Sequence, residues 1–167
     1  MIEIQTVEHS DFAGLLALNE DAVPHVNSID SAQMAYFLQQ AVAFFKVVED
    51  HQLAGFVISL GSGADYQSPN YTWFDRELQN FLYIDRIMVH PQFRRRGVAR
   101  LIYQELERRA RANGVTSLCC EVNLMPPNPE SLALHLSLGF VQVGTQFTYG
   151  GEKEVVLLVK QLDSTNE

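Results

Sequence analysis

An apolar run, a basic turn and a long helical pattern follow one another in the middle of this chain. The run covers 81–89, the helical pattern covers 98–112, and the turn reads Arg94-Arg95-Arg96-Gly97-Val98-Ala99. A strand that enters a helix through such a turn predicts an anion site. The first-turn N–H groups lack intrahelical acceptors, and the helix dipole adds positive potential. Gly97 and Ala99 let the backbone approach a ligand closely.

The same turn excludes two common phosphate sites. It lacks the Lys-Ser/Thr ending of a nucleoside triphosphate loop, and it lacks the three-glycine fingerprint of a dinucleotide fold. Its three arginines favour phosphate, because a guanidinium forms charge-assisted hydrogen bonds with phosphate oxygens.

A second segment carries a family resemblance. It reads Glu121-Val122-Asn123 and then continues from Asn128-Pro129 to Leu138-Gly139-Phe140. One motif is Arg-x-x-Gly-x-Ala after a strand; the other is an Asn, a short helix and Leu-Gly-Phe after the next strand. Together they resemble the GNAT superfamily of N-acetyltransferases. The segments Ser68-Pro69-Asn70-Tyr71-x-Trp73-Phe74 and Pro126-Pro127-Asn128-Pro129 resemble a functionally uncharacterised bacterial subgroup of that superfamily. The resemblance covers 81–160 well and the first 80 residues in outline. It implies acetyl-coenzyme A (acetyl-CoA) as the acyl donor.

Length and composition indicate one domain spanning 1–167, with enough apolar content for a core. The GNAT resemblance implies that this domain is an N-acetyltransferase. No apolar run reaches the length of a membrane span, and the N-terminus shows no signal pattern. The two cysteines, Cys119 and Cys120, are adjacent and would point to opposite faces of a strand, so we expect buried thiols and no disulfide. A reducing cytoplasm is the expected location.

Charge is distributed unevenly along the chain. Residues 86–111 hold eight arginines and two glutamates, a net +6, whereas the whole chain carries −8 and the remainder therefore −14. One basic cluster in an acidic chain argues against nucleic acid as a partner and favours a polyanionic cofactor at the cluster. The acidic remainder would suit a cationic amine, although acidity alone also serves solubility.

Periodicity predicts an α/β fold of mixed order, β-α-α-β-β-β-α-β-α-β-β. Ser10 is expected to cap the first helix, Asp30 to Gln33 a second one, and Asn128 a third one with Pro129 at its first position. Residues 61–80 are expected to form a long loop. The GNAT resemblance implies a mostly antiparallel sheet flanked by helices, with the fourth and fifth strands splayed around the thioester arm.

The resemblance also implies the cofactor contacts. Backbone and side chains of the turn would hold the pyrophosphate, and the fourth strand would hold the pantetheine arm. Asn128 would contact that arm or position the splayed strand, and Asn123 would face acceptor or cofactor from the end of the fifth strand. The predicted set is Ile87, Met88, Val89, Arg94, Arg95, Arg96, Gly97, Val98, Ala99, Arg100, Asn123, Asn128 and Ser131. Asn128 could instead serve as a helix cap, and Asn123 could simply close a strand. No metal is expected.

Two residues are predicted to be catalytic. Glu121 lies where some GNAT enzymes carry a general base; the alternative is a solvent-facing strand carboxylate. His135 stands where many GNAT enzymes have a Tyr that protonates the coenzyme A thiolate. Neutral imidazole retains one N–H, so His135 could donate a proton or act as a base; the alternative is a packed helix residue.

The acceptor site is expected between the first helices and in the aromatic segment before the fourth strand. Aromatic rings near carboxylates suit an ammonium group through cation–π and ionic contacts. The predicted residues are Tyr66, Asn70, Trp73, Phe74 and Asp85. Alternatively, Trp73 and Phe74 pin the loop to the core, and Asp85 pairs with a nearby Arg.

These features predict an acetyl-CoA-dependent N-acetyltransferase that acts by direct attack of a primary amine. The expected acceptor is a small molecule, and the alternative acceptor is a protein N-terminus or lysine. No nucleophile–base pair indicates a covalent enzyme intermediate. Two alternatives stay open: a non-catalytic acyl-CoA sensor, and a protein that acts through an interface. The residues do not fix the oligomeric state; the resemblance is compatible with a homodimer.

Overall fold

The computed structural model of the protein describes residues 1–162. It has a mixed α/β architecture with a seven-stranded sheet in the order β1-β2-β3-β4-β5-β7-β6. The chain divides into two compact units, Met1–Leu60 with Ile84–Arg109, and Gly61–Tyr83 with the residues from Ala110 onward. Strand β4 (Phe81–Val89) and helix α4 (Val98–Ala112) each contribute residues to both units.

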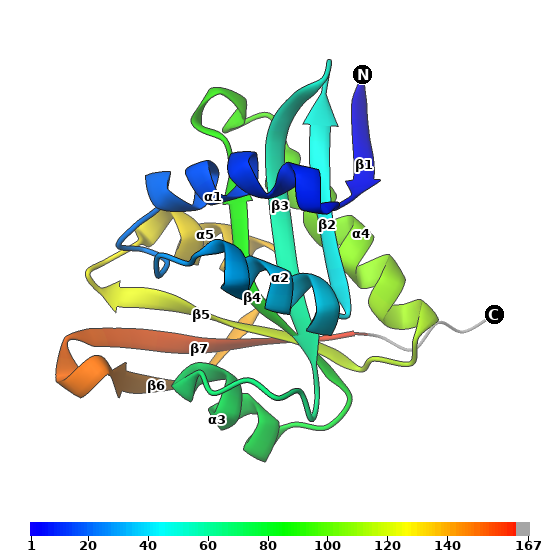
Figure 1. The fold of residues 1–167 in the computed structure, drawn as a ribbon. Coiled ribbons are helices and arrows are strands. Elements are labelled where there is room, and N and C mark those ends of the chain that lie inside the picture. The colour runs from blue at the N-terminus through cyan, green and yellow to red at the C-terminus, as the bar shows by residue number, and fades with distance from the viewer. Residues whose placement is uncertain (163–167) are drawn as a thin grey trace. The chain divides into compact units, whose positions relative to one another are not determined.

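The first unit places helices on both faces of its strands (Figure 1). Its strands are β1 (Ile2–Thr6), β2 (Ala43–Glu49), β3 (Gln52–Gly61) and the end of β4. Its helical elements are η1 (His9–Asp11), α1 (Phe12–Asp21), α2 (Ser31–Gln40), η2 (Pro91–Phe93) and most of α4.

Neighbouring residues of β2 show how the two faces are covered. The Arg109 guanidinium of α4 lies 4.4 Å from the centroid of the Phe45 ring, whereas the Lys46 ammonium pairs with Asp11 of η1 at 2.5 Å. Successive side chains of a strand point to opposite faces. The amphipathic helix α4 therefore covers one face, and the N-terminal helical segment covers the other.

The second unit contains the remaining strands and two short helices. Its elements are α3 (Pro69–Glu77), the start of β4, β5 (Ser117–Met125), α5 (Pro129–Ser137), β6 (Val141–Thr148), η3 (Tyr149–Gly151) and β7 (Lys153–Gln161). Strands β4 and β5 pair in parallel from Phe81↔Ser117 to Tyr83↔Cys119, and β7 pairs antiparallel with β5 and β6. The divergence of β4 from β5 beyond this pairing stays a prediction.

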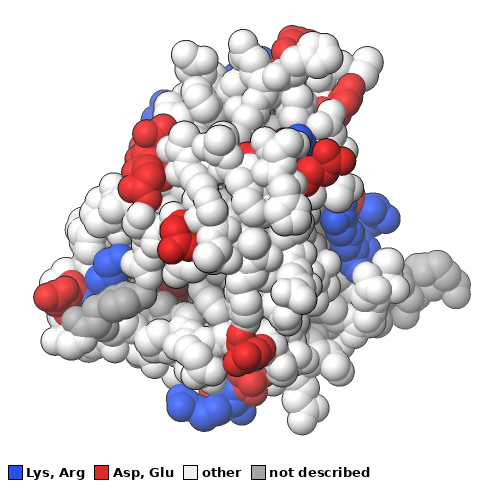
Figure 2. All heavy atoms as spheres, in the orientation of Figure 1, with Lys and Arg blue, Asp and Glu red and all other residues white. Residues whose placement is uncertain are grey.

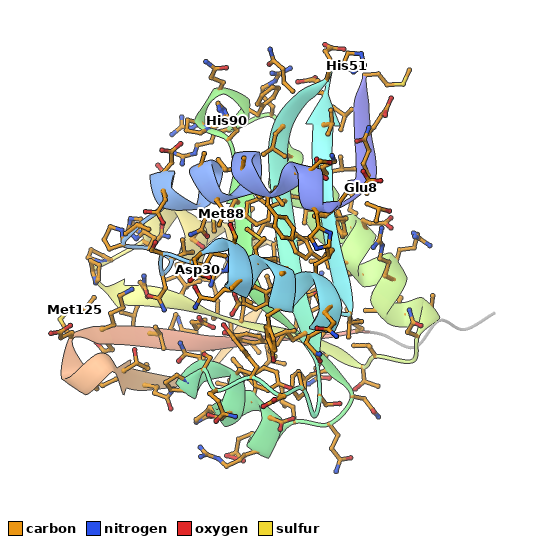
Figure 3. All side chains as sticks on the ribbon, in the orientation of Figure 1. Glu8, Asp30, His51, Met88, His90 and Met125 are labelled. Atoms are coloured by element: carbon orange, nitrogen blue, oxygen red, sulfur yellow. The ribbon has the colours of Figure 1, made fainter. Side chains whose placement is uncertain are left out.

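Most predicted elements are confirmed, and two expectations are wrong. The segment 61–80 is not a continuous loop, because it contains α3; Ser68 caps this helix by accepting from the Tyr71 N–H, and Pro69 occupies its first position. Asp11, not Ser10, is the residue before α1. The Asp30 cap is confirmed and includes a reciprocal bond from the Asp30 N–H to the Gln33 side chain. Asp30 lies at the start of α2 (Figure 3).

The surface carries both charge signs, and the two cysteines are as expected. Acidic side chains are scattered over the face shown in Figure 2, whereas basic side chains gather in a few groups. Cys119 and Cys120 are free and buried, and burial raises the pKa of the Cys119 thiol. A buried thiol that resists ionisation is a poor nucleophile. No helix among residues 1–162 is long and apolar enough to cross a membrane.

Candidate active site

The turn between β4 and α4 belongs to the first unit and has an unusual backbone. Arg95 and Gly97 both have positive φ angles, 62° and 80°. The first α-helical hydrogen bond of α4 runs from the Leu101 N–H to the Gly97 carbonyl at 3.0 Å, so the N–H groups of 98–100 lie outside the helix's own ladder. Turns of this kind, opening a 15-residue helix, form concavities that suit anions.

Gly97 has open space around it. A Cβ atom built at this position would meet no protein atom within 4 Å. Packing against the protein therefore does not require a glycine here. Gly97 allows the left-handed backbone conformation and leaves room for a ligand. This geometry fits a diphosphate group that approaches the backbone closely.

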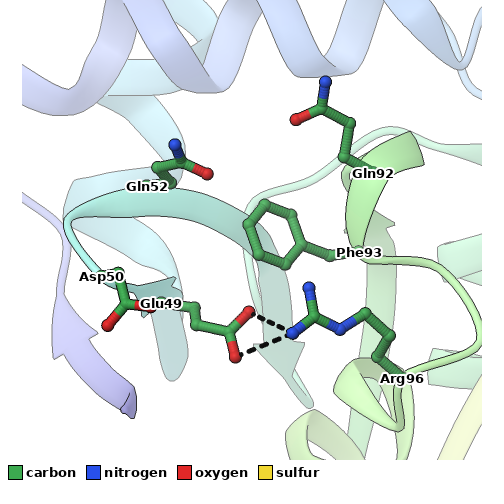
Figure 4. Close-up of a pocket in the computed structure, with 6 residues that line it drawn as sticks. All are labelled: Glu49, Asp50, Gln52, Gln92, Phe93 and Arg96. Atoms are coloured by element: carbon green, nitrogen blue, oxygen red, sulfur yellow. Dashed lines mark hydrogen bonds and ion pairs between the residues drawn. The ribbon is translucent and has the colours of Figure 1, made fainter.

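The arginines of the turn are arranged differently from one another. Arg94 and Arg95 are exposed and form no ion pair within the described part of the chain. Arg96 pairs with Glu49 at 2.9 Å, and its guanidinium lies 5.2 Å from the centroid of the Phe93 ring (Figure 4). Arg100 is also exposed, Ala99 is half-buried, and Val98 is buried in the core.

A surface hollow of about 270 Å³ adjoins the Arg96–Glu49 pair. It is lined by Glu49, Asp50, Gln52, Gln92, Phe93 and Arg96. Its two carboxylates disfavour phosphate in the hollow itself, so the backbone turn stays the predicted anion site.

The end of β4 is held close to β3. A Cβ atom built on Gly55 would lie 2.5 Å from the Met88 carbonyl oxygen, and the His90 N–H donates to the Ala54 carbonyl. Met88 is buried on β4, whereas Ile87 and Val89 are half-buried (Figure 3). These are the strand residues for which a pantetheine contact is predicted.

Glu121 belongs to the second unit and has a partner that sequence reasoning missed. The Tyr83 hydroxyl donates to Glu121 Oε1 at 2.8 Å. Glu121 is half-buried on β5, so the alternative of a solvent-facing carboxylate does not describe its position.

His135 lies on α5 and is only 3% exposed. Its Nδ1 is 2.7 Å from the Ser131 carbonyl oxygen, and because a carbonyl only accepts, Nδ1 must carry the proton. Burial lowers the pKa of His135, and the bond to Ser131 opposes part of that shift. The neutral ring therefore presents Nε2 as an acceptor nitrogen.

Backbone and side-chain hydrogen bonds link Asn123, near the end of β5, to Asn128 and Ser131 at the start of α5. The Asn128 N–H donates to the Asn123 carbonyl at 3.1 Å, and Asn128 Oδ1 accepts from the Ser131 N–H at 3.4 Å. Asn128 is thus the cap of α5, as one alternative expected. Asn123 is buried next to an irregularity in the β5–β7 register.

The predicted acceptor residues occupy different environments. Phe74 is fully buried and packs against Tyr83, so its position supports the anchoring alternative. Tyr66 and Trp73 are half-buried, and Asn70 accepts a hydrogen bond from Gln146 of β6.

Asp85, in the first unit, pairs with Arg86 at 2.7 Å, as one alternative expected. Arg86 is buried and also donates to Asn19 Oδ1 and the Asn27 carbonyl. This network ties β4 to α1 and to the loop between α1 and α2. Only the Asp85–Arg86 adjacency is visible in the sequence.

No group of three or more His, Cys, Asp or Glu side chains within residues 1–162 is arranged to hold a metal ion.

Comparisons with known proteins agree with this geometry. The sequence profile of the acetyltransferase (GNAT) family matches residues 12–140. A curated relative, thialysine N-epsilon-acetyltransferase of Caenorhabditis elegans, is 26% identical over 98 residues, and the match spans 59% of this chain and 60% of the relative's length.

Solved structures share the fold at low identity. The ribosomal-protein-S18-alanine N-acetyltransferase of Escherichia coli has a TM-score of 0.74 at 19% identity, covering 100% of this chain and 97% of that one. Ard1 of Thermoplasma volcanium has a TM-score of 0.78 at 14% identity, covering 96% and 97%. The structure of yncA from Salmonella typhimurium, solved with its cofactor acetyl-CoA, has a TM-score of 0.72 at 18% identity, covering 99% and 96%.

The strand–turn–helix geometry and the family profile together define the class: this chain belongs to the acetyltransferase (GNAT) family. Enzymes of this family are transferases that use acetyl-CoA as the acyl donor.

Proposed function

We propose that this protein is an acetyl-CoA-dependent N-acetyltransferase whose acceptor is a primary amine of a small molecule. The observation that carries the proposal is the turn at 94–99, with its left-handed Arg95 and Gly97 at the start of α4. The curated relative is named for the N-epsilon group of thialysine, which supports an amine acceptor. The acidic charge of the chain also suits a cationic substrate.

Acetyl-CoA supplies an acetyl group activated as a thioester. Backbone N–H groups of the turn and of the first turn of α4 bind the diphosphate, and Arg94 and Arg95 add positive charge there. Strand β4, at 87–89, would orient the pantetheine arm. Holding donor and acceptor together accounts for much of the rate.

Glu121 acts as the base in the proposed reaction. An alkylammonium with pKa near 10 must lose a proton before its nitrogen can attack. Glu121 accepts that proton, directly or through water. The nitrogen forms a bond to the carbonyl carbon, the carbon–sulfur bond breaks, and the sulfur leaves with the bonding electrons. The nitrogen releases its second proton to solvent to become an amide, and solvent protonates the thiolate. No covalent bond to the enzyme is needed.

His135 does not fit the role of proton donor in its neutral form. Its N–H is directed to Ser131, and burial disfavours the charged ring that would have a second N–H. We assign Nε2 an accepting role. The same observation favours a second candidate, a non-catalytic acyl-CoA sensor that has lost the acid step.

Calorimetric titration with acetyl-CoA, followed by thiol-release assays with a panel of amines, separates the candidates. The panel should include lysine analogues, polyamines and peptides with free N-termini. Binding with release that depends on a small amine is the expected result. Binding without release for any amine supports the sensor, and absence of binding overturns the assignment of the turn.

A further inference from the structure

The strand pairing of the second unit brings a buried tyrosine to the predicted base. Tyr83 of β4 pairs with Cys119 of β5, and Glu121 lies two residues further along β5, on the same face as Cys119. The Tyr83 hydroxyl donates to Glu121 Oε1 at 2.8 Å. Tyr83 is 0% exposed.

The ring of Tyr83 is fixed from two directions by α3. The Tyr71 ring lies 5.4 Å away in an edge-on arrangement, and the Phe74 ring lies 5.9 Å away. Tyr71 is itself held, because its hydroxyl donates to the Gly61 carbonyl and accepts from the Ala64 N–H. A hydroxyl on a ring packed in this way has little freedom to leave its acceptor.

We propose that Tyr83 is a positioning residue for the base, which holds Glu121 in its charged form and aims it for proton transfer. This inference rests on the proposed function, in which Glu121 accepts the proton of the amine. A hydroxyl that donates to a carboxylate favours the ionised form over the neutral acid.

The ionisable groups around Glu121 come from its own strand, from β7 and from the two helices that pack against β5. On β5 the ionisable neighbours of Glu121 are Cys119 and Cys120. Glu121 pairs with the apolar Leu157 of β7, whereas the charged residues of β7 pair elsewhere on β5, Lys160 with Leu118 and Glu154 with Met125. Helices α3 and α5 pack against β5. His135 of α5 is buried. The charged residues of these two helices are exposed: Asp75, Arg76, Glu77 and Glu130.

The test compares Tyr83→Phe with Tyr71→Phe. Both variants remove one hydroxyl from a buried ring of the same aromatic cluster, but only the first removes the donor to Glu121. In Tyr83→Phe, the acid limb of the pH profile of kcat/KM should move upward by about one pH unit, and kcat should fall roughly 10-fold. In Tyr71→Phe, the limb should stay in place whatever the loss of thermal stability. Equal profiles for Tyr83→Phe and wild type would overturn the inference.

A measurement that needs no turnover provides an independent decision. The side-chain carboxyl resonance of Glu121, assigned by its disappearance in Glu121→Gln, can be titrated by ¹³C NMR in wild type and in both Tyr→Phe variants. A midpoint that rises by about one pH unit only in Tyr83→Phe supports the pair; an unchanged midpoint refutes it. If wild type binds acetyl-CoA but acetylates no amine, the proposed function fails while this titration still decides the role of Tyr83.

Discussion

The turn proposed to bind the cofactor, in the first unit, and the residues predicted to be catalytic, in the second unit, are built in opposite ways. Arg94, Arg95 and Gly97 are exposed, and the turn is shaped by backbone angles that few residues adopt. Glu121 and His135 are covered, and each has a hydrogen-bond partner within its own unit. The difference follows from what each region must do.

A site for a multiply charged diphosphate can stay open to water, because the ligand itself completes the hydrogen bonding of the N–H groups. A base must be held in one protonation state and direction before the substrate arrives, and this needs burial and a fixed partner. Substitutions in the turn should therefore change binding, whereas substitutions in the second unit should change turnover and pH dependence.

The largest effect is expected from Glu121→Gln. Loss of a general base lowers kcat by roughly 10²- to 10⁴-fold, with little change in the affinity for acetyl-CoA. Steady-state kinetics and calorimetry on the same preparation measure both. Glu130→Gln, an equal charge change at an exposed position of α5, is the control and should retain activity. Weaker cofactor binding in Glu121→Gln would contradict the division between the two regions.

Gly97→Glu should have the largest effect on the binding of acetyl-CoA. A carboxylate in the turn repels the diphosphate, so the Kd for acetyl-CoA should rise at least about 100-fold, or about 2.7 kcal/mol. Thermal unfolding should show a cost of about 1–2 kcal/mol from the positive φ.

Gly114→Glu is the matched control for this change. Gly114 has a φ of 74° and similar open space, but lies beyond the C-terminal end of α4. Gly114→Glu should lose a similar amount of stability while its affinity for acetyl-CoA stays unchanged. If its affinity fell as well, the weaker binding of Gly97→Glu would come from damage to the fold and not from a change in the binding site.

His135 should make stability depend on pH. Its pKa is lowered in the folded state, so below about 6.5 the unfolded chain binds a proton that the folded protein does not. Stability contributed by the neutral ring is therefore present above 6.5 and is lost as the pH falls toward the folded-state value. Urea unfolding at pH 7.5 and 5.5 should show a smaller pH-dependent loss for His135→Gln than for wild type, while exposed His9→Gln should follow wild type.

Glu49→Gln should have the smallest effect. It releases Arg96, whose side chain is half exposed, so stability should change by less than about 1 kcal/mol. Removal of a negative charge beside the turn should tighten acetyl-CoA binding by about two- to fivefold at low salt. Asp50→Asn removes a neighbouring carboxylate that pairs with the N-terminus instead, and it should tighten binding less.

Local patterns predicted the strand–turn–helix part of the fold well. The bounds of β4 and α4 and the caps at Asp30 and Asn128 follow from residues adjacent in the sequence. Helix α3 was missed because the aromatic, Gly and Pro residues of 61–80 favoured a loop. Ser68-Pro69, which is a helix-capping signal, could have revealed it.

Partners distant in the sequence could not be predicted in the same way. The Tyr83–Glu121 bond depends on the register of two strands, and the Arg96–Glu49 pair depends on where a hairpin ends. The tautomer of His135 depends on a backbone oxygen one helical turn earlier, which no residue type reveals.

Gly55 gives the protein a point of mutational fragility far in sequence from the turn. With a Cβ 2.5 Å from the Met88 carbonyl, even alanine would push β4 out of line where the pantetheine arm is expected. Selection on a cofactor site can thus act through a residue whose only contribution is the absence of a methyl group. A map of tolerated substitutions would show position 55 as restricted as any residue that touches the cofactor.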